Sequence, residues 1–473
     1  MLNKKNKICS AKPRLREGWW GQTFSMKKTL LIIGLAIIAI SSFAQSKDSA
    51  SYSFSVQQAV DFAFQNQHDI KNATIDEEIA KKKVSEITGM GLPQINSSFD
   101  IKKFLELPTS LIPAEFFGGP PGTFAALKFG TTYQATAGLD ASQLIFSGDY
   151  FLGLQAAKVY VELSTKAIQR SQIEIDAAVS KAYYTVLINE ERMKLMDANI
   201  ERIKKAMDDT KALLDNGFVE KIDLDRLTVT YNNLLIEQDK VQRLLKLGTY
   251  LLKYQMGMDI NADLTLTDKL SDIKLDIANN VTAEKFDYSK RVEYNLFETQ
   301  FKLANLDLKR NHFSYLPNAF AYGALSGSAY RQQFDLFSRK AAWYPTSLIG
   351  AKVTMPIFTG LQRNAKNQQA KLSVQKAENN MEFIKKSIDL ELTSSMTMLQ
   401  NASVSLENQK KNIAIAEDVY RVSKIKYEQG VGSNIEMINA ETALKESQTN
   451  YFNALFDALV AKIDFDKANG NLK

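Results

Sequence analysis

The sequence predicts a mostly α-helical fold with β-hairpins, built as a tandem repeat of two similar halves. A helical stretch from Gly148 to about Asn216 has no internal break, and a second runs from Gly360 to Gln429. Each begins directly after a β-like motif, Ile145-Phe146-Ser147-Gly148 or Ile357-Phe358-Thr359-Gly360. At ~1.5 Å per residue each helix would be roughly 100 Å long, which no compact soluble domain requires.

Residues 1–44 are typical of an upstream extension followed by a signal peptide, with translation expected to start at Met26. The basic pair Lys27-Lys28 precedes an apolar run from Leu30 to Ile40, and Ser42-Phe43-Ala44 provides small residues for cleavage. The apolar run is too short to span a bilayer, which needs about 20 residues. We therefore expect export and cleavage after Ala44; the alternative is a short buried helix.

Removing this segment changes the charge balance of the chain. It carries eight Lys/Arg and one Glu, so the formal charge of +6 becomes −1. A near-neutral mature chain gives no indication of a basic surface for nucleic acid, so we expect no nucleic-acid partner. The only cysteine, Cys9, is also removed, which excludes disulfides and thiol chemistry.

Residues 45–257 form the first predicted repeat. A helix begins at the capping-box pattern Ser55-Val56-Gln57-Gln58 and is expected to continue to about Thr88. A β-hairpin at about 92–146, the long helix 148–216 and a helix at 223–255 follow. The hairpin loop, from Leu105 to Gly130, is long and rich in proline and glycine.

Residues 258–286 are a loop-rich insertion, and residues 287–473 form the second repeat. Its predicted parts are a helix from about Phe286 to Ser314, a hairpin at about 316–358, the long helix 360–429 and a helix at 433–468. Residues 69–95 align with residues 293–319 without a gap, which is the direct sign of duplication.

The hairpins alternate apolar and polar residues, for example in the run Ile95, Ser97, Phe99 and Ile101 against polar neighbours. One apolar and one polar face suit a barrel strand between lipid and water, or a strand pair half-buried on a soluble core. Phe320 and Tyr322 fit poorly, because they fall on the face opposite to Ile95 and Phe99.

Trp343-Tyr344 beside the second hairpin suits an interfacial aromatic belt or a buried aromatic pair. The helix lengths indicate that two short helices lie end to end along each long one. Four strands cannot close a barrel, and open edges are not tolerated in lipid, so a membrane-spanning form needs several chains.

The repeated unit resembles the TolC-type outer-membrane efflux protein family. The motifs that carry the resemblance are Ser55-Val56-Gln57-Gln58-Ala59-Val60, Gly91-Leu92-Pro93-Gln94-Ile95, the two Ile-Phe-(Ser/Thr)-Gly motifs and Tyr427-Glu428-Gln429-Gly430-Val431-Gly432-Ser433. The resemblance implies a homotrimer with a shared 12-stranded outer-membrane β-barrel in lipid and a periplasmic α-helical tunnel. It also implies an exit duct for efflux or type I secretion of small molecules or proteins, with a periplasmic adaptor (membrane fusion) protein and an inner-membrane pump as partners.

The resemblance places adaptor docking at the turns that end the long helices. The docking candidates are Gly217, Val219, Gly430, Val431, Gly432 and Ser433. Small turns suit close approach by another helical hairpin, although glycines there also simply end helices.

The same resemblance places a gate just beyond the turns, at Glu436 and Asn439, with Asp223 and Arg226 as their counterparts in the first repeat. In a trimer, Glu436 would contribute a ring of carboxylates that attracts cations. Alternatively, Glu436 closes a capping box with Ser433, and Asp223 favours its own helix N-terminus.

No enzyme motif, cofactor site or metal-ligand spacing is present, so we expect no catalysis, no cofactor and no metal. The mature chain has two histidines, His68 and His312, far apart in helical stretches. The competing interpretation is a pore-less periplasmic or surface coiled-coil scaffold or adhesin. The exported substrate is left open, because the pump that selects it is another protein.

Overall fold

The structure is a computed structural model that describes residues 51–270, 286–335, 338 and 342–472. The predicted upstream extension, signal peptide and cleavage site after Ala44 lie outside these residues. Contacts divide the chain into two units. The smaller unit contains Asn261–Thr265 and, at the N-terminal side, Tyr52, whose carbonyl accepts a hydrogen bond of 3.2 Å from Thr265 Oγ1. Strands β1 (Ser51–Phe54) and β6 (Asp263–Leu266) form a two-stranded sheet.

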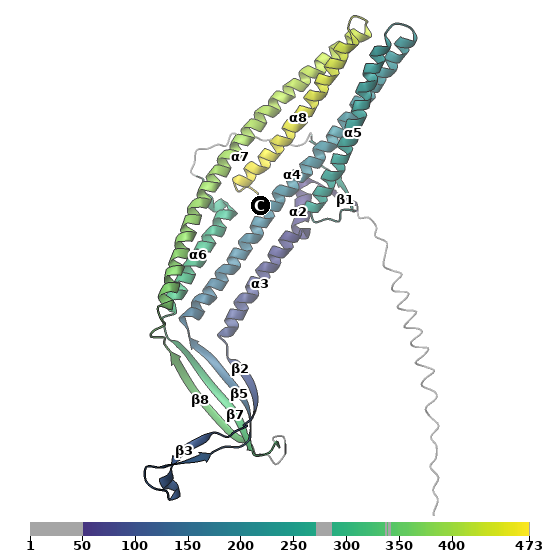
Figure 1. The fold of residues 1–473 in the computed structure, drawn as a ribbon. Coiled ribbons are helices and arrows are strands. Elements are labelled where there is room, and N and C mark those ends of the chain that lie inside the picture. Colours follow the sequence, from purple (N-terminus) through teal and green to yellow (C-terminus); the bar gives the residue numbers. More distant parts are fainter. Residues whose placement is uncertain (1–50, 271–285, 336–337, 339–341, 473) are drawn as a thin grey trace, which may run out of the picture. The chain divides into compact units, whose positions relative to one another are not determined.

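The larger unit contains two long helices, α4 (Gly148–Asp215) and α7 (Gln362–Glu428) (Figure 1). The limits expected from the sequence were 148–216 and 360–429. The second helix starts later because Gly360 and Leu361 both have left-handed backbones, with φ of 58° and 62°. None of the helices in the described residues is long and apolar enough to cross a membrane.

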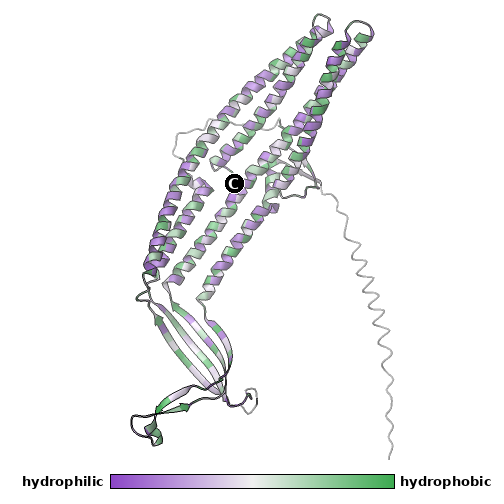
Figure 2. Cartoon of the chain, viewed as in Figure 1, coloured by the Kyte–Doolittle hydropathy of each residue, from purple (hydrophilic) through white to green (hydrophobic). Residues whose placement is uncertain are grey.

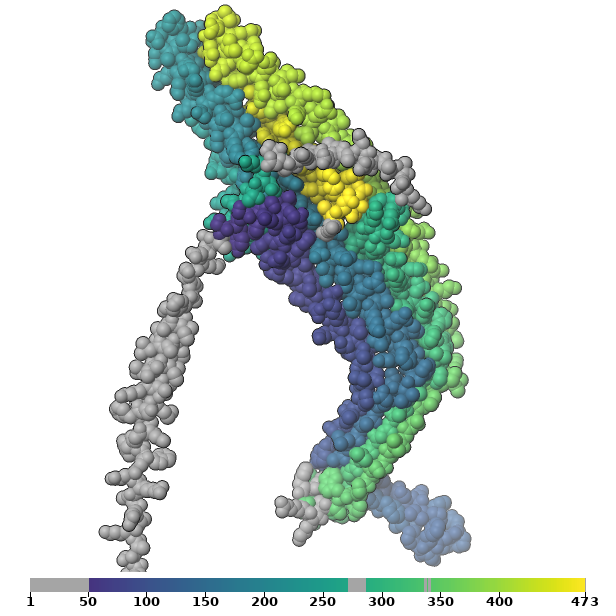
Figure 3. Space-filling model, turned by 180° about the vertical axis from the view of Figure 1, so that it is seen from behind, coloured from purple at the N-terminus to yellow at the C-terminus, as the bar shows by residue number. Residues whose placement is uncertain are grey.

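Two short helices pack along each long helix. Helices α3 (His68–Met90) and α5 (Lys221–Gln255) contact α4, whereas α6 (Val292–Phe313) and α8 (Asn434–Ala468) contact α7. The short helices meet end to end: a Cβ on Gly257 would lie 2.8 Å from the carbonyl oxygen of Asn66, and one on Gly470 would lie 2.7 Å from that of Lys290. Figure 3 shows the yellow end of α8 in line with the green α6.

The structure corrects three predicted helix limits. The single helix from Ser55 to Thr88 is wrong, because Gln67 is extended (ψ 134°) and separates α2 (Val56–Asn66) from α3. The Gln67 side chain caps α3 by accepting a bond from the Asp69 amide, 2.7 Å. The capping box of Ser55 and Gln58 is confirmed.

Helix α5 begins at Lys221, two residues before the predicted 223, and the helix predicted from Phe286 is a short 3₁₀ turn (η4, Tyr288–Lys290) followed by α6. In the second case the extended backbone of Arg291, with ψ of 121°, separates the two pieces. Position 291 lies 224 residues after Gln67, the same offset as in the aligned residues 69–95 and 293–319, so both repeats interrupt the chain at the same place.

Four antiparallel strands form one sheet, in the order β2 (Gln94–Lys103), β5 (Tyr133–Phe146), β7 (Asn318–Arg331) and β8 (Tyr344–Thr354). The pairing of β5 with β7 joins the hairpins of the two repeats. Within the described part of the chain, β2 and β8 each pair on one side only. The sheet therefore ends in two strand edges that are available for pairing.

The register gives the sheet one apolar and one polar face. Ile95 pairs with Ala141, which pairs with Gly323, which pairs with Ile349, so this row lies on one face. The large apolar residues on that face are exposed, Ile349 to 92%, whereas the small residues Ala135 and Ala329 are buried. Phe320 and Tyr322 lie on the other, polar face, as the sequence pattern indicated. Tyr322 occupies the space over Gly350, where a Cβ would lie 2.8 Å from its ring.

The sequence predicted a long loop between β2 and β5, but this segment is not a simple loop. It contains its own hairpin of β3 (Thr109–Pro113) and β4 (Phe124–Lys128), joined by a 3₁₀ turn, η2 (Ala114–Phe117). Four prolines and four glycines between Leu105 and Gly130 interrupt the alternation of apolar and polar residues, so the sequence pattern did not show these strands.

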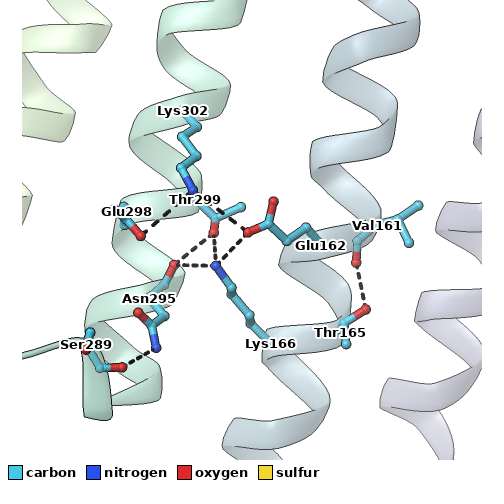
Figure 4. A network of polar contacts seen from close by, with 9 residues as sticks. All are labelled: Val161, Glu162, Thr165, Lys166, Ser289, Asn295, Glu298, Thr299 and Lys302. Atoms are coloured by element: carbon cyan, nitrogen blue, oxygen red, sulfur yellow. Dashed lines mark hydrogen bonds and ion pairs between the residues drawn. The ribbon is translucent and has the colours of Figure 1, made fainter.

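Helices α4 and α6 join the two repeats through a polar network (Figure 4). The ammonium group of Lys166 donates to Glu162 (2.7 Å), to the hydroxyl of Thr299 (2.8 Å) and to the carbonyl of Asn295 (3.4 Å). Thr299 is fully buried, so its hydroxyl needs these partners. Lys302 lies 3.9 Å from the same Glu162.

Candidate functional site at the helix tips

The turns at the ends of α4 and α7 have the same backbone geometry. Gly217 and Gly430 are left-handed, with φ of 77° and 71°. The amide of Phe218 donates to the Leu213 carbonyl (2.9 Å), and that of Val431 donates to the Lys426 carbonyl (3.0 Å). This is the usual glycine end of a helix. A Cβ on either glycine would meet nothing within 4 Å, so backbone conformation explains both glycines.

The other docking candidates differ in their surroundings. Gly432 is crowded, because a Cβ there would lie 2.9 Å from the Cβ of Lys426. Val431 and Ser433 are exposed, and Val219 is half-buried. Val431 therefore presents an apolar side chain at the outermost turn of the second repeat.

Asp223 and Arg226 lie in the first turns of α5. Their side chains form an ion pair of 3.7 Å within the helix. Asp223 is in the position where the helix dipole favours a negative charge. Arg226 is exposed, so the pair is accessible from the surface.

Glu436 and Asn439 are both exposed on the first turns of α8. The hydroxyl of Ser433 accepts a bond of 3.2 Å from the Glu436 amide, which is one half of the capping box considered above. The Glu436 carboxylate lies 3.5 Å from the ammonium group of Lys426 on α7 instead of closing the second half. Its charge is therefore directed across the tip.

The two tips are joined to each other by contacts of Asn434, Thr210 and Tyr427, which the sequence analysis did not select as site residues. The side-chain amide of Asn434 donates to the Asp223 carbonyl (3.0 Å), and the hydroxyls of Thr210 and Tyr427 are 3.1 Å apart. Below these contacts lies an apolar cluster of Leu227, Ala416, Tyr420, Met437, Ala440 and Leu444. The predicted gate residues thus stand on one connected base.

A buried polar layer lies further along the same helices. Arg202 of α4 approaches Glu441 of α8 to 4.0 Å and lies over the ring of Tyr420, 5.1 Å from its centroid. Burial raises the pKa of Glu441 and raises that of Tyr420 to about 12. The signal in the sequence was a glutamate at an apolar position of the α8 pattern, between Ala440 and Leu444.

A groove of about 400 Å³ opens between the ends of α4 and α7. Its walls combine apolar and charged side chains, including Leu213, Phe218, Met437, Lys205, Asp209 and Glu428. Such a lining fits an amphipathic helix better than a small polar solute. Among the described residues, no group of three or more His, Cys, Asp or Glu side chains is arranged to hold a metal.

Comparison with known families shows which proteins the chain is similar to. The model of the family described as outer membrane efflux protein matches residues 324–471, which include β8, α7 and the second tip. The match covers 148 of the 473 residues, so this part of the chain is similar to outer membrane efflux proteins. The resemblance to outer-membrane efflux proteins predicted from the sequence is confirmed over this part of the chain.

Curated members of the family are similar over most of their length. The probable efflux pump outer membrane protein TtgC of Pseudomonas putida is 23% identical over 350 residues, 72% of this chain and 69% of that protein. The outer membrane protein TolC of Salmonella enteritidis is 19% identical over 459 residues, 94% of this chain and 87% of that protein.

The fold of an outer-membrane efflux protein is also found by structural comparison. The CmeC outer membrane channel of Campylobacter jejuni has a TM-score of 0.69 at 16% identity, covering 88% of this chain and 85% of that one. A structure of CusC has a TM-score of 0.70 at 15% identity, covering 90% of this chain and 95% of that one. The fold class predicted from the sequence is therefore confirmed at the level of one chain.

Proposed function

We propose that three copies of this efflux channel protein form one exit duct of a tripartite export system. The sheet contributes four strands per chain, so three chains would supply twelve strands for one closed barrel. The helices would continue the duct as a periplasmic tunnel. A periplasmic adaptor would connect the tunnel to an inner-membrane pump.

The observation that carries this proposal is the match between the two flanks of the chain. From one side of the chain to the other, the strands of the sheet and the helices follow the same order of repeats. Strand β2, α3 and α5 lie on one flank, and β8 and α7 lie on the other. Each flank combines an open strand edge with exposed apolar residues on its helices.

The exposed apolar residues on the helices of both flanks recur at intervals of 3, 4, 7, 11 or 14 residues, the intervals of a heptad pattern, as in helices that pack against a partner. On the first flank they are Ile75, Ile79, Ile222, Val229, Ile236, Leu247 and Leu251. On the second flank they are Phe383, Leu390, Val404, Ile415, Val419 and Val422. Two different, complementary flanks make a head-to-tail contact, which closes into a ring when the rotation permits.

The faces of the sheet suit the same arrangement. The exposed apolar face that holds Ile95 and Ile349 would contact lipid, and the polar face would line the water-filled pore. Trp343 lies against Gly327 on the apolar face, which is the position of an interfacial aromatic residue. We therefore favour the aromatic-belt interpretation of Trp343.

The tips are the proposed site of docking and gating. The turns at Gly217 and Gly430 to Ser433 and the groove beside Phe218 would receive a helical hairpin of the adaptor. In the trimer, three copies of Glu436 would surround the axis, with Asn439, Asp223 and Arg226 nearby.

The first experiment measures the native mass of the protein extracted from outer membranes in mild detergent. The expected species is a trimer; a soluble monomer would contradict the proposal and favour the pore-less scaffold.

A second experiment tests the lipid-facing side of the sheet. Ile349→Arg places a charge on that face, which destabilises a membrane barrel by about 2–4 kcal/mol at mid-bilayer depth. This variant is therefore expected to be lost from the outer membrane. The matched control is Thr346→Arg, which lies on the polar face of the same strand.

The gate is tested by conductance of the trimer in planar bilayers. Glu436→Gln is expected to reduce the preference for cations, because it removes the proposed ring of carboxylates. Glu446→Gln, an exposed carboxylate farther along α8, is the control. Equal cation preference in the wild type and both variants would exclude Glu436 from the gate.

A further inference from the structure

The hairpin of β3, η2 and β4 is unusually apolar for an exposed extension. Residues 104–132, which connect β2 to β5, include only three charged residues, Glu106, Glu115 and Lys128. Figure 2 shows the hydrophobic colour along this hairpin, and Figure 3 shows it projecting beyond the sheet. The family comparison and the proposed duct leave it without a role.

The apolar side chains cover the exposed face and the end of the hairpin. The register pairs Leu111 with Ala126 and Pro113 with Phe124, so these residues share one face. Large apolar residues exposed on the extension are Leu105, Leu111, Phe116, Phe117, Phe124 and Phe129. Soluble surfaces rarely gather such a patch without a binding partner.

Internal hydrogen bonds hold the end of the hairpin in shape. The Glu115 carboxylate accepts a bond of 3.1 Å from the Gly122 amide, which uses its charge inside the turn. The Ala114 amide donates to the Thr123 carbonyl (2.8 Å), and Gly118 and Gly122 take the left-handed conformation. Phe116 and Phe117 are thus presented by a defined turn rather than by a loose loop.

The root of the hairpin lies at an aromatic band on the apolar face of the sheet. The ammonium group of Lys103, the last residue of β2, lies over the ring of Tyr133, the first residue of β5, at 5.7 Å. The Tyr133 and Phe334 rings are 5.5 Å apart, and Trp343 packs at Gly327 nearby in the register. Lysine and aromatic residues mark the boundary between lipid and water in barrels.

We propose that the hairpin is a lipid anchor whose aromatic end, Phe116 and Phe117, inserts into the outer leaflet beside the barrel. The inference rests on the proposed duct, because it needs the apolar face of the sheet in lipid. The hairpin continues that face from its interfacial band. Lys128 is exposed on the same face as Leu111 and Phe124, near the root, where it meets anionic headgroups.

The distribution of apolar groups favours lipid over a second copy of the chain. The end of the hairpin is apolar on its open face and at its turn, and a fluid acyl environment accommodates such a shape without a complementary surface. A contact between copies would bury one face and leave the turn in water. The test must therefore separate lipid, protein and water around Phe117.

The experiment places a nitroxide label at single cysteines in the trimer, reconstituted in vesicles of phosphatidylethanolamine and phosphatidylglycerol. The only cysteine of the sequence, Cys9, lies in the segment expected to be removed, so each introduced cysteine is the only one in the mature chain. Labels are placed at Phe117→Cys, at Ile349→Cys as the lipid reference and at Val431→Cys as the water reference. Collision with oxygen reports lipid, and collision with a water-soluble nickel chelate reports water.

The expected result is that the label at position 117 collides with oxygen more than with nickel, as the label at 349 does. A ratio like that at 431 would place the hairpin in water and overturn the anchor. Shielding from both reagents would indicate packing between copies and would also overturn it. A water-like ratio at 349 would overturn the barrel itself, and the anchor with it.

Discussion

Two arginine–glutamate pairs link helices of this protein, and they differ in burial and in distance. Arg291 is 3% exposed and bonds to Glu293 (3.0 Å), Glu391 (2.7 Å) and the carbonyl of Ala468 (2.8 Å). Arg202 is 25% exposed and stays 4.0 Å from Glu441. The second oxygen of Glu441 has no hydrogen-bond partner among the described residues.

The difference appears in the two glutamates. Burial opposes the charge of Glu293, but the hydrogen bond and charge of Arg291 outweigh it and lower the pKa of Glu293 below 4.5. Burial also opposes the charge of Glu441, and the more distant Arg202 compensates only in part, so the pKa of Glu441 is raised above 4.5. A buried ion pair therefore stabilises the fold only when close contacts replace the lost hydration.

The largest predicted effect comes from removing the better-connected arginine. Arg291→Ala leaves two carboxylates and the end of α8 without their partner, and is expected to cost about 3–5 kcal/mol of stability. Arg202→Ala should cost less, because its pair is longer and more exposed. Denaturant unfolding of the detergent-solubilised protein measures both, and equal losses would refute the distinction.

Acid should weaken the first pair. Because the pKa of Glu293 is lowered in the folded state, its contribution is complete above about 4.5 and is lost as the pH falls through the folded value. Thermal unfolding midpoints should therefore decline more steeply below pH 4.5 in the wild type than in Glu293→Gln. Parallel pH profiles would show that Arg291 does not favour the charged form of Glu293.

The smallest effect has the opposite sign. A raised pKa means that folded Glu441 binds a proton more readily than the unfolded chain, so its contribution to stability decreases as the pH rises above 4.5. Glu441→Gln should therefore raise the unfolding midpoint at pH 7, with the gain disappearing below pH 4.5. A loss of stability at pH 7 would mean that Arg202 is an adequate partner.

The parts of the fold whose sequence pattern repeats over many residues could be predicted from the sequence. Helices α4 and α7 repeat their apolar spacing over many turns, so a few irregular residues do not hide them. The alternation that predicted the strands also revealed Phe320 and Tyr322 on the polar face. That exception has a local cause, because Gly350 leaves room for the Tyr322 ring.

Features set by one residue or by tertiary contact were not accessible. The break at Gln67 lies in a helical pattern and depends on the meeting of α3 with the end of α5. The same alignment of repeats would have paired Gln67 with Arg291, yet it could not show that Arg291 is buried. At the tips, nothing in the sequence pattern marked Asn434, although its side chain bonds to the opposite turn.

Each long helix, α4 or α7, is continuous, whereas the two short helices that pack along it meet end to end. At Gly257 and Gly470 the ends of the short helices are in close backbone contact, but the chain does not run from one helix into the next. Tension across these two junctions is therefore carried by α4 and α7. Bending that places the short helices on the outer, convex side pulls their ends apart. Bending that places them on the inner, concave side presses their ends together. The long helices are therefore the elements that resist tension, and the two junctions between short helices make the stiffness of the structure depend on the direction of bending.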